Sequence, residues 1–139
     1  MLPPQTRGDP AIGLQFLQNY QPKLLSILRI VVALLFLQHA TAKLFGYPEP
    51  MMTGHLPPLL LAAGIIELVG SVLIGLGLFT RIAAFICSGE MAVAYWLYHV
   101  GQSGQWIPLL NQGDEAILYC FVFLYIAAAG PGPWSIDRS

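Results

Sequence analysis

Four long apolar runs make up most of this chain and leave few folds open to it. They cover approximately residues 24–45, 59–79, 81–100 and 114–129, and short connections join them. A helix needs about 20 mostly apolar residues to span a bilayer. Only 9% of the 139 residues are charged, whereas a soluble domain carries about 25%. We therefore predict an all-α integral membrane protein, folded as one four-helix bundle.

Residues that break or cap helices mark the expected boundaries. The sequence GYP at 46–48 is expected to stop the first helix, and GPGP at 130–133 is expected to end the fourth. Thr80 is expected to cap the N-terminus of the third helix. The connection between the third and fourth helices, which contains glycines and a proline, is expected to cross the membrane surface.

The basic residues predict the orientation of the bundle. Four spans place both termini and the connection between the second and third helices on one side. That side collects most of the basic residues, namely Arg7, Lys23, Arg81 and Arg138, with Arg29 nearby. The other side has only Lys43. The positive-inside rule therefore places both termini in the cytoplasm. Residues 1–22 become a cytoplasmic arm, followed by a membrane domain at 23–139.

Charge, cysteine and histidine content argue against several functions. The formal net charge is −1, so no basic surface predicts a nucleic-acid partner. Cys87 and Cys120 lie inside predicted spans and form no C-x-x-C motif, so we interpret them as packing residues. The three histidines do not have the spacing of a metal site, and we predict no bound metal.

A small set of polar side chains falls inside the predicted spans, where a charge costs roughly 2.5–3.5 kcal/mol at the centre. Those expected to form one cluster are His39, Lys43, Glu67, Glu90, Glu115 and Tyr119. At a rise of about 1.5 Å per residue, His39, Lys43, Glu67 and Glu115 lie about 20–28 Å above the inner helix ends, and Glu90 about 14 Å. Helical periodicity turns these side chains toward the inside of the bundle. We therefore expect Glu67 and Glu115 to neutralise His39 and Lys43.

The residues alone leave two interpretations of this cluster open. In the first, the charges pair only to fix the register of the helices, as polar contacts do in membranes. In the second, they line a cavity that opens outward and binds a small ligand or moves protons. His39 is the first candidate for such a role, because an imidazole changes charge near neutral pH. Arg29 lies alone near the inner side, and we interpret it as snorkelling to anionic head groups.

Three stretches of the chain carry a resemblance to a known family. They are LLSILRIVVALLFLQHATAKLFG at 24–46, ELVGSVLIGLGLFTR at 67–81 and DEAILYCFVFLYIAAAGPGPWSID at 114–137. Together they resemble the DoxX family of small bacterial membrane proteins. The matching positions are Arg29, His39, Lys43, Glu67, Gly75, Gly77, Arg81, Gly130, Pro131, Gly132, Ser135 and Asp137. Of these, we expect structural or topological roles for Arg29, Arg81, Gly130, Gly132 and Asp137.

The resemblance implies a multi-pass protein of the bacterial inner membrane with a link to redox chemistry. Family members are similar to a subunit of thiosulfate:quinone oxidoreductase, and others associate with oxidative-stress enzymes. Our leading expectation is a membrane subunit of an oxidoreductase complex that binds quinone, rather than an enzyme by itself. Its expected partners are the lipid bilayer and either another protein of that complex or a second copy. The alternatives are a non-catalytic scaffold or assembly subunit, and a transporter of small molecules or protons.

Overall fold

The fold is all-helical, as the sequence predicts. The computed structural model describes residues 10–138, so the first part of the expected arm, with Arg7, lies outside the described residues. The α-helices are α1 (Gln21–Phe45), α2 (Pro58–Leu76), α3 (Thr80–Ala94), α4 (Gly101–Ser103), α5 (Pro108–Asn111) and α6 (Asp114–Ala129). A 3₁₀ helix, η1 (Pro10–Tyr20), precedes α1, and a π-helical segment, η2 (Tyr95–Val100), joins α3 to α4. Between residues 10 and 138 the chain has no strand.

Glycines in the left-handed conformation end the first two long helices. Gly46 has a φ of 66° at the end of α1, which stops at Phe45 as predicted. Gly77 has a φ of 69° and ends α2 at Leu76, so this helix is shorter than its apolar run. A residue without Cβ adopts this conformation without strain. The predicted end of α6 at Ala129 is also confirmed.

The predicted N-cap of α3 is wrong. Thr80 is the first residue of the helix and makes no side-chain capping bond. The carboxylate of Asp137, at the other end of the chain, replaces it: the backbone N–H groups of Phe79 and Thr80 each donate to one of its oxygens at 2.9 Å. A carboxylate at a helix N-terminus satisfies free donors and complements the helix dipole.

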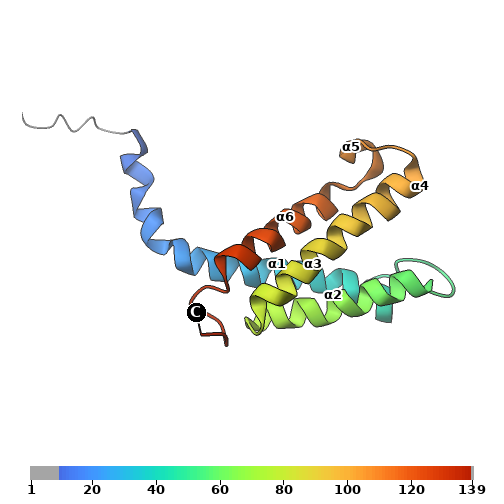
Figure 1. Cartoon of the computed structure of the whole chain (residues 1–139), viewed down its shortest axis with the longest axis horizontal. Helices are drawn as coiled ribbons and strands as arrows, with labels where there is room; N and C mark the ends of the chain where they lie inside the picture. Colours follow the sequence, from blue (N-terminus) through green and yellow to red (C-terminus); the bar gives the residue numbers. More distant parts are fainter. Residues whose placement is uncertain (1–9, 139) are drawn as a thin grey trace, which may run out of the picture.

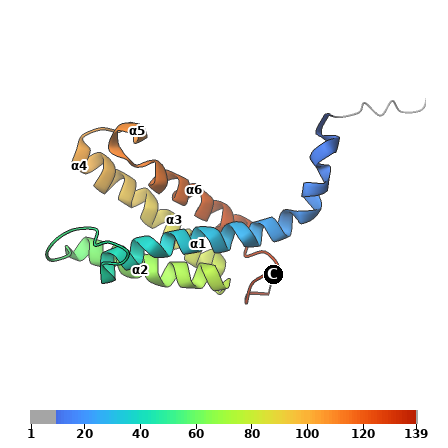
Figure 2. The ribbon, with the colours of Figure 1, turned by 180° about the vertical axis from the view of Figure 1, so that it is seen from behind.

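The long helices form two pairs that diverge from one end. α1 packs along α2, and α3 packs along α6 (Figures 1 and 2). The turn between α2 and α3 joins the pairs, which spread apart away from it in the shape of a V (Figure 1). Near this turn a Cβ on Gly70 of α2 would overlap the sulfur of Cys87 of α3. The two pairs therefore have an end at which they touch, called here the closed end, and an opposite open end.

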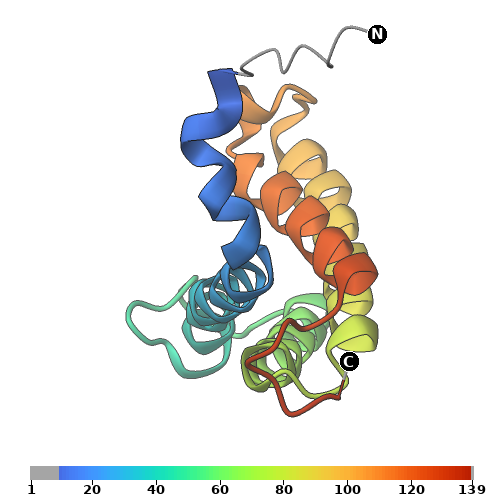
Figure 3. The same ribbon diagram turned by 90° about the vertical axis from the view of Figure 1, so that its left-hand side faces the viewer.

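A segment that follows α6 seals the closed end. Residues 130–138, called here the closing segment, pass across the end of α2 (Figure 3). The backbone N–H of Ile136 donates to the carbonyl of Leu76 at 3.2 Å, and that of Asp137 donates to the carbonyl of Gly77 at 2.7 Å. The closing segment and the turn between α2 and α3 are nearly 60 residues apart in the chain. Both backbone and side-chain hydrogen bonds join them.

Arg29 does not snorkel, and that interpretation is wrong. Its side chain is fully buried. The guanidinium donates to the carbonyls of Ile74 at 2.6 Å, Gly75 at 2.8 Å and Pro131 at 2.7 Å, and also to that of Trp134. The planar fork of an arginine suits several acceptors at once. Arg29 therefore satisfies the free carbonyls at the end of α2 and ties α1 to the closing segment.

The other residues with an expected structural role lie at the same end. Arg81 donates to the carbonyls of Ala127 at 3.0 Å and Ala128 at 2.5 Å, which are otherwise free at the end of α6. Gly130 has a φ of 92°, and a Cβ there would meet the Arg81 guanidinium at 2.9 Å. Gly132 has a φ of 76° and packs directly on Ser26. Both glycines thus allow the closing segment to turn against neighbouring helices.

The surface of the molecule is apolar where a soluble protein would be polar. Within residues 10–138, Gly13–Phe45 and Pro58–Leu76 are long and apolar enough to cross a membrane. Large apolar side chains are exposed on all four long helices, for example Leu34, Ile65, Phe85 and Leu118. Arg29, Glu67 and Ser71, by contrast, are buried. Four spans stay a prediction, and this polar interior beneath an apolar surface is consistent with it.

Candidate functional site

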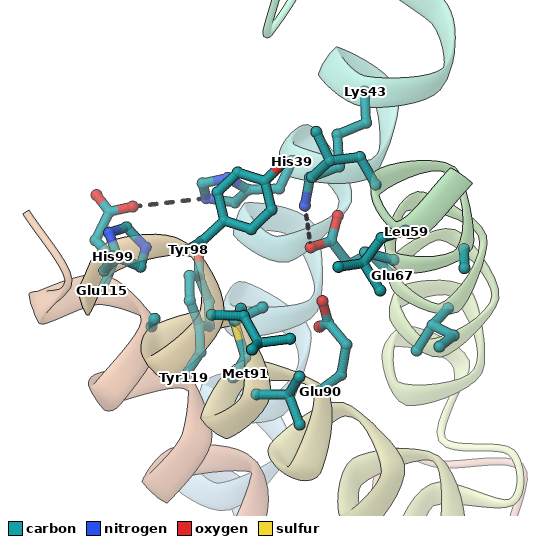
Figure 4. A pocket seen from close by; sticks show the side chains of 18 of the residues that line it. His39, Lys43, Leu59, Glu67, Glu90, Met91, Tyr98, His99, Glu115 and Tyr119 are labelled. Carbon is teal, nitrogen blue, oxygen red and sulfur yellow. Dashed lines mark hydrogen bonds and ion pairs between the residues drawn. The ribbon is translucent and has the colours of Figure 1, made fainter. Parts of the chain in front are cut away.

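A cavity of about 730 Å³ lies between the two helix pairs. Its walls come from α1, α2, α3, η2 and α6, and from the loop that follows α1. The lining side chains are mostly apolar, with a few polar groups among them (Figure 4). A small-molecule site typically has 300–1,000 Å³ and this kind of lining. All six residues of the predicted cluster, His39, Lys43, Glu67, Glu90, Glu115 and Tyr119, line this cavity.

Lys43 of α1 and Glu67 of α2 form an ion pair inside the cavity wall. The Lys43 ammonium group donates to Oε1 of Glu67, and the side chains are only 9% and 1% exposed. Gly64 allows this contact, because a Cβ there would lie 3.3 Å from Cβ of Lys43 and 3.0 Å from the Leu44 side chain. The predicted neutralisation of Lys43 by Glu67 is confirmed.

His39 and Glu115 form a looser pair at the mouth of the cavity. Nε2 of His39 lies 3.6 Å from Oε2 of Glu115, and the side chains are 37% and 74% exposed (Figure 4). Such an exposed pair contributes little to stability. The His39 ring also stands edge-on to Tyr119, with the ring centres 5.7 Å apart. His39 is therefore held in position but remains accessible from the open end.

Glu90 of α3 points toward the Lys43–Glu67 pair from the opposite helix pair (Figure 4). Oε2 of Glu90 and Oε2 of Glu67 are both buried. Two carboxylates thus share the neighbourhood of one ammonium group. The two carboxyl groups lie close enough to hydrogen-bond to each other, and a proton shared between them lets one carboxyl donate to the other.

Aromatic rings form the back wall of the cavity. Phe36 of α1 packs against Tyr119 and Phe123 of α6, with ring centres 5.2 Å and 4.8 Å apart. The rings of Tyr119 and Phe123 are stacked at 5.8 Å. These contacts connect α1 to α6, and Phe36 and Tyr119 give the cavity an aromatic side.

The described residues hold no cluster of three or more His, Cys, Asp or Glu side chains that could bind a metal ion. Cys87 and Cys120 are both free thiols. The hydroxyl of Ser88 donates to the Cys120 carbonyl at 2.7 Å, between α3 and α6.

Several residues that line the cavity were not predicted from the sequence. These are Met51 and Met52 from the loop after α1, and Met91 and Tyr98 from α3 and η2. Periodicity of 3.6 residues does not predict the position of Tyr98, because η2 is a π-helical segment that changes which side chains face inward. For the part of the cavity formed by the loop after α1, the adjacent methionines Met51 and Met52 were the only indication in the sequence.

Comparisons with known proteins show to which family the chain belongs. A family model described as DoxX matches residues 24–100. A Haemophilus influenzae protein, described only as uncharacterized, is 48% identical over 126 residues, which cover 88% of this chain and 94% of that protein. A Mycobacterium tuberculosis protein, described as an uncharacterized membrane protein, is 30% identical over 129 residues, covering 80% of this chain and 77% of that protein. No solved structure matches significantly. From the extent of these matches, this chain is a membrane protein that belongs to the DoxX family.

Proposed function

We propose that the chain crosses the bacterial inner membrane four times, through α1, α2, the continuous helix of α3, η2 and α4, and finally α6. Both termini then lie in the cytoplasm, with residues 1–22 as a cytoplasmic arm before the membrane domain at 23–139. Arg29, Arg81 and the closing segment share the closed end, whereas Lys43 lies near the end of α1 that points away from it. This distribution supports a cytoplasmic closed end and an outward-facing cavity.

Reporter fusions test this orientation. A reporter that is active only in the cytoplasm should give a signal when it is fused after Ser139 or inserted at Thr80, in the turn between α2 and α3. The same reporter inserted near Gln105, in the loop before α5, should be silent. Signal only from the insertion near Gln105 would overturn the orientation.

We further propose that the cavity binds a small amphipathic molecule, with a membrane quinone as the leading candidate, and that the protein serves a redox complex as its membrane subunit. One observation carries this proposal: the buried Lys43–Glu67 pair, with Glu90 beside it, faces a mostly apolar cavity of about 730 Å³. Pairing that served packing alone would need no such space.

The route into the cavity also suits a ligand dissolved in lipid. Exposed apolar side chains of α2, α3 and η2, among them Leu59, Ile86 and Leu97, line it on the side where the two helix pairs diverge. A ligand with a long apolar tail would leave that tail between α2 and α3, and its polar head would reach His39, Lys43 and Glu67.

Titration with a quinone analogue tests the proposed site. We expect His39→Gln to weaken binding of the analogue by about tenfold or more, because the ring orders the mouth beside Tyr119, and to leave the melting temperature close to wild type. The matched control is His55→Gln, the same change at an exposed loop position outside the cavity. If the analogue binds neither wild type nor variant, the protein is not a quinone-binding subunit.

A scaffold role is the second candidate, and the Lys43–Glu67 pair favours it. This pair joins α1 to α2 and is mutually neutralising, as a pair that only fixes helix register would be. Under that proposal His39→Gln and His55→Gln behave alike in every assay. Loss of a protein partner in pull-down experiments after changes to exposed helix faces would then be the informative result.

A further inference from the structure

We infer that η1 lies along the cytoplasmic surface of the membrane, with one apolar edge among the phospholipids of that leaflet. This inference rests on the proposed topology, which places the start of α1 at the cytoplasmic side. η1 turns away from the axis of α1 instead of continuing it (Figures 1 and 3). Residues 13–20 are all exposed, and Leu14, Phe16 and Tyr20 are at least half exposed, at 65%, 55% and 50%. The burial of these side chains therefore needs a partner other than the described part of the chain.

The length of α1 places η1 at the level of the lipid head groups. α1 has 25 residues, which at about 1.5 Å per residue make a helix of about 37 Å. The hydrocarbon core of a bilayer is about 30 Å thick, and the head groups extend this to about 40–45 Å. When Phe45 lies among the outer head groups, Tyr20 at the other end of α1 reaches the inner ones. The chain thus turns where the bilayer ends, and η1 runs along its surface.

The 3₁₀ geometry of η1 sorts its side chains into edges, because residues at i and i+3 lie above one another. One edge is apolar and carries Leu14, Leu17 and Tyr20, whereas a neighbouring edge carries the amides of Gln15 and Gln18. An amphipathic helix places its apolar edge at the boundary between head groups and acyl chains. η1 contains no charged residue. Since α1 already anchors η1 to the membrane, η1 needs no charge of its own to reach the surface.

A groove in the angle between η1 and α1 gives a lipid chain a place to pack. The groove has about 460 Å³ and lies between η1, α1 and α6. It is lined by Leu17 of the apolar edge, Leu24 and Leu28 of α1 and Tyr125 of α6, and Gln18 adds an amide. Leu24 and Leu28 also belong to the exposed apolar surface of α1. The groove therefore continues the lipid-facing surface of α1, and its polarity fits an acyl chain below a lipid head group.

The residues at the bend are of the kinds that occur at membrane surfaces. Nζ of Lys23 lies 5.9 Å from the centre of the Tyr20 ring, and both residues are exposed. Tyrosine is enriched at the level of the head groups, and a lysine there is attracted to anionic lipids. A protein partner or a second copy would have to displace the lipid that surrounds α1 at this level. We therefore assign the apolar edge to phospholipid.

Spin labels on single cysteines test this placement in the full chain, reconstituted in nanodiscs of phosphatidylethanolamine and phosphatidylglycerol. The test pair is Leu17→Cys on the apolar edge and Gln15→Cys on the amide edge of the same helix. The references are Leu34→Cys on the exposed apolar face of α1 and Glu49→Cys in the exposed loop after α1. Accessibility to oxygen, which concentrates in lipid, is compared with accessibility to a nickel chelate, which stays in water.

We expect the label at Leu17 to lie about 5–10 Å into the boundary between head groups and acyl chains. Its ratio of oxygen to nickel accessibility should fall between those of the Leu34 and Glu49 labels and should exceed that of the Gln15 label. A ratio at Leu17 equal to that at Glu49 would place η1 in water and overturn the inference. A ratio no higher than that at Gln15 would overturn the orientation of the apolar edge. A Leu17 label that neither reagent reaches would mean that protein, not lipid, covers this edge.

The Leu34 label distinguishes failure of this inference from failure of the topology on which it rests. A Leu34 label deep in lipid with a Leu17 label in water ends the inference alone, whereas a Leu34 label in water ends the proposed spans. The reporter fusions assign the leaflet, because label depth is the same from either side.

The labels are introduced in a background with Cys87→Ala and Cys120→Ala, so that each chain carries one thiol. If this background melts well below wild type, the labels are introduced with both native cysteines in place. The signal of wild type treated with the same reagent is then subtracted, so the comparison of Leu17 with Gln15 still decides the placement of η1.

Discussion

Lys43 and Glu67 form a buried ion pair, and substitution of either residue alone is expected to destabilise the protein. Each side chain is nearly inaccessible, and each is the other's counter-charge. A buried ion pair often adds little over an apolar pair of the same size, but removing one partner leaves an uncompensated charge. The pair therefore constrains α1 against α2 strongly, whether or not it also contacts a ligand.

We predict that Glu67→Ala lowers the melting temperature in detergent, because it leaves the Lys43 ammonium group without its counter-charge. Breaking a buried pair costs about 3–5 kcal/mol in soluble proteins. The control is Glu49→Ala, which removes an exposed carboxylate from the loop after α1 and should be nearly silent. The double change Lys43→Met with Glu67→Ala should recover part of the loss. Equal melting of wild type and Glu67→Ala would show that Lys43 is solvated after all.

The sequence predicts individual site residues well where a single helix determines their position. Facing and depth along α1 and α2 correctly brought Lys43 next to Glu67. The same reasoning failed for Arg29, because its acceptors lie 45 to 105 positions away in the chain. Nothing in the periodicity of α1 indicates that the closing segment returns to that helix. Arg29, a single charge near a helix end, was therefore interpreted as snorkelling to lipid head groups.

At the level of whole helices, the closing segment connects elements that would otherwise meet only at one turn. Asp137 bonds to the N-terminus of α3, and Ile136 bonds to the end of α2. Phe79, between them, has a φ of 48°, a conformation that is unfavourable for a large side chain. Its N–H is held by Asp137. The carboxylate thus supports the strained turn from which the two helix pairs diverge.

This bond predicts a specific dependence of stability on pH. The pKa of the Asp137 carboxyl is held below its usual value, mainly by the hydrogen bond from the backbone N–H of Thr80. The Thr80 side chain, the N–H of Phe79 and the charge of Arg29 lower this pKa further. A lowered pKa in the folded state contributes stability that is complete above the unfolded value of about 3.9 and is lost as the pH falls toward the folded value. Asp137→Asn should therefore melt below wild type at pH 7.

The difference between the two proteins is the quantity to measure, because other carboxylates titrate in the same range. Melting of wild type and Asp137→Asn is followed in one detergent from pH 7 down to about pH 3. The gap between the melting temperatures should be constant at neutral pH and should narrow below about pH 4. A gap that persists unchanged to the lowest pH would mean that the carboxylate charge is irrelevant and that only the shape of the side chain matters.

Helix boundaries were predicted correctly only where neighbouring residues in the chain determine them. Phe45 and Ala129 were correctly predicted as last residues, because glycine and proline follow them directly in the chain. The N-terminus of α3 was not, because its cap comes from Asp137 and not from a neighbouring residue. The π-helical segment η2 was also missed, since the apolar pattern continues through it without a break.

The shape of the whole molecule follows from where its two helix pairs touch. They meet at the closed end and spread toward the open end, and the cavity occupies the space between them (Figure 1). Gly70 lies at the contact of α2 with α3, and even a single added carbon there would overlap the sulfur of Cys87. The small residue therefore sets how closely the pairs approach, and with it the width of the cavity.

We predict that Gly70→Ala forces α2 and α3 apart and destabilises the protein by about 1–3 kcal/mol, the usual cost of overpacking. Adding Cys87→Ala removes the sulfur that the new methyl group meets, so the double variant should melt above Gly70→Ala. Gly89→Ala is the matched control for melting, because a Cβ at that exposed position of α3 meets nothing within 4 Å. It is not a control for binding, because Gly89 lines the cavity. Melting in detergent measures stability, and titration with the quinone analogue measures whether a wider cavity binds it more weakly. If Cys87→Ala fails to recover stability in the Gly70→Ala background, the two pairs are held at their distance by contacts other than this one.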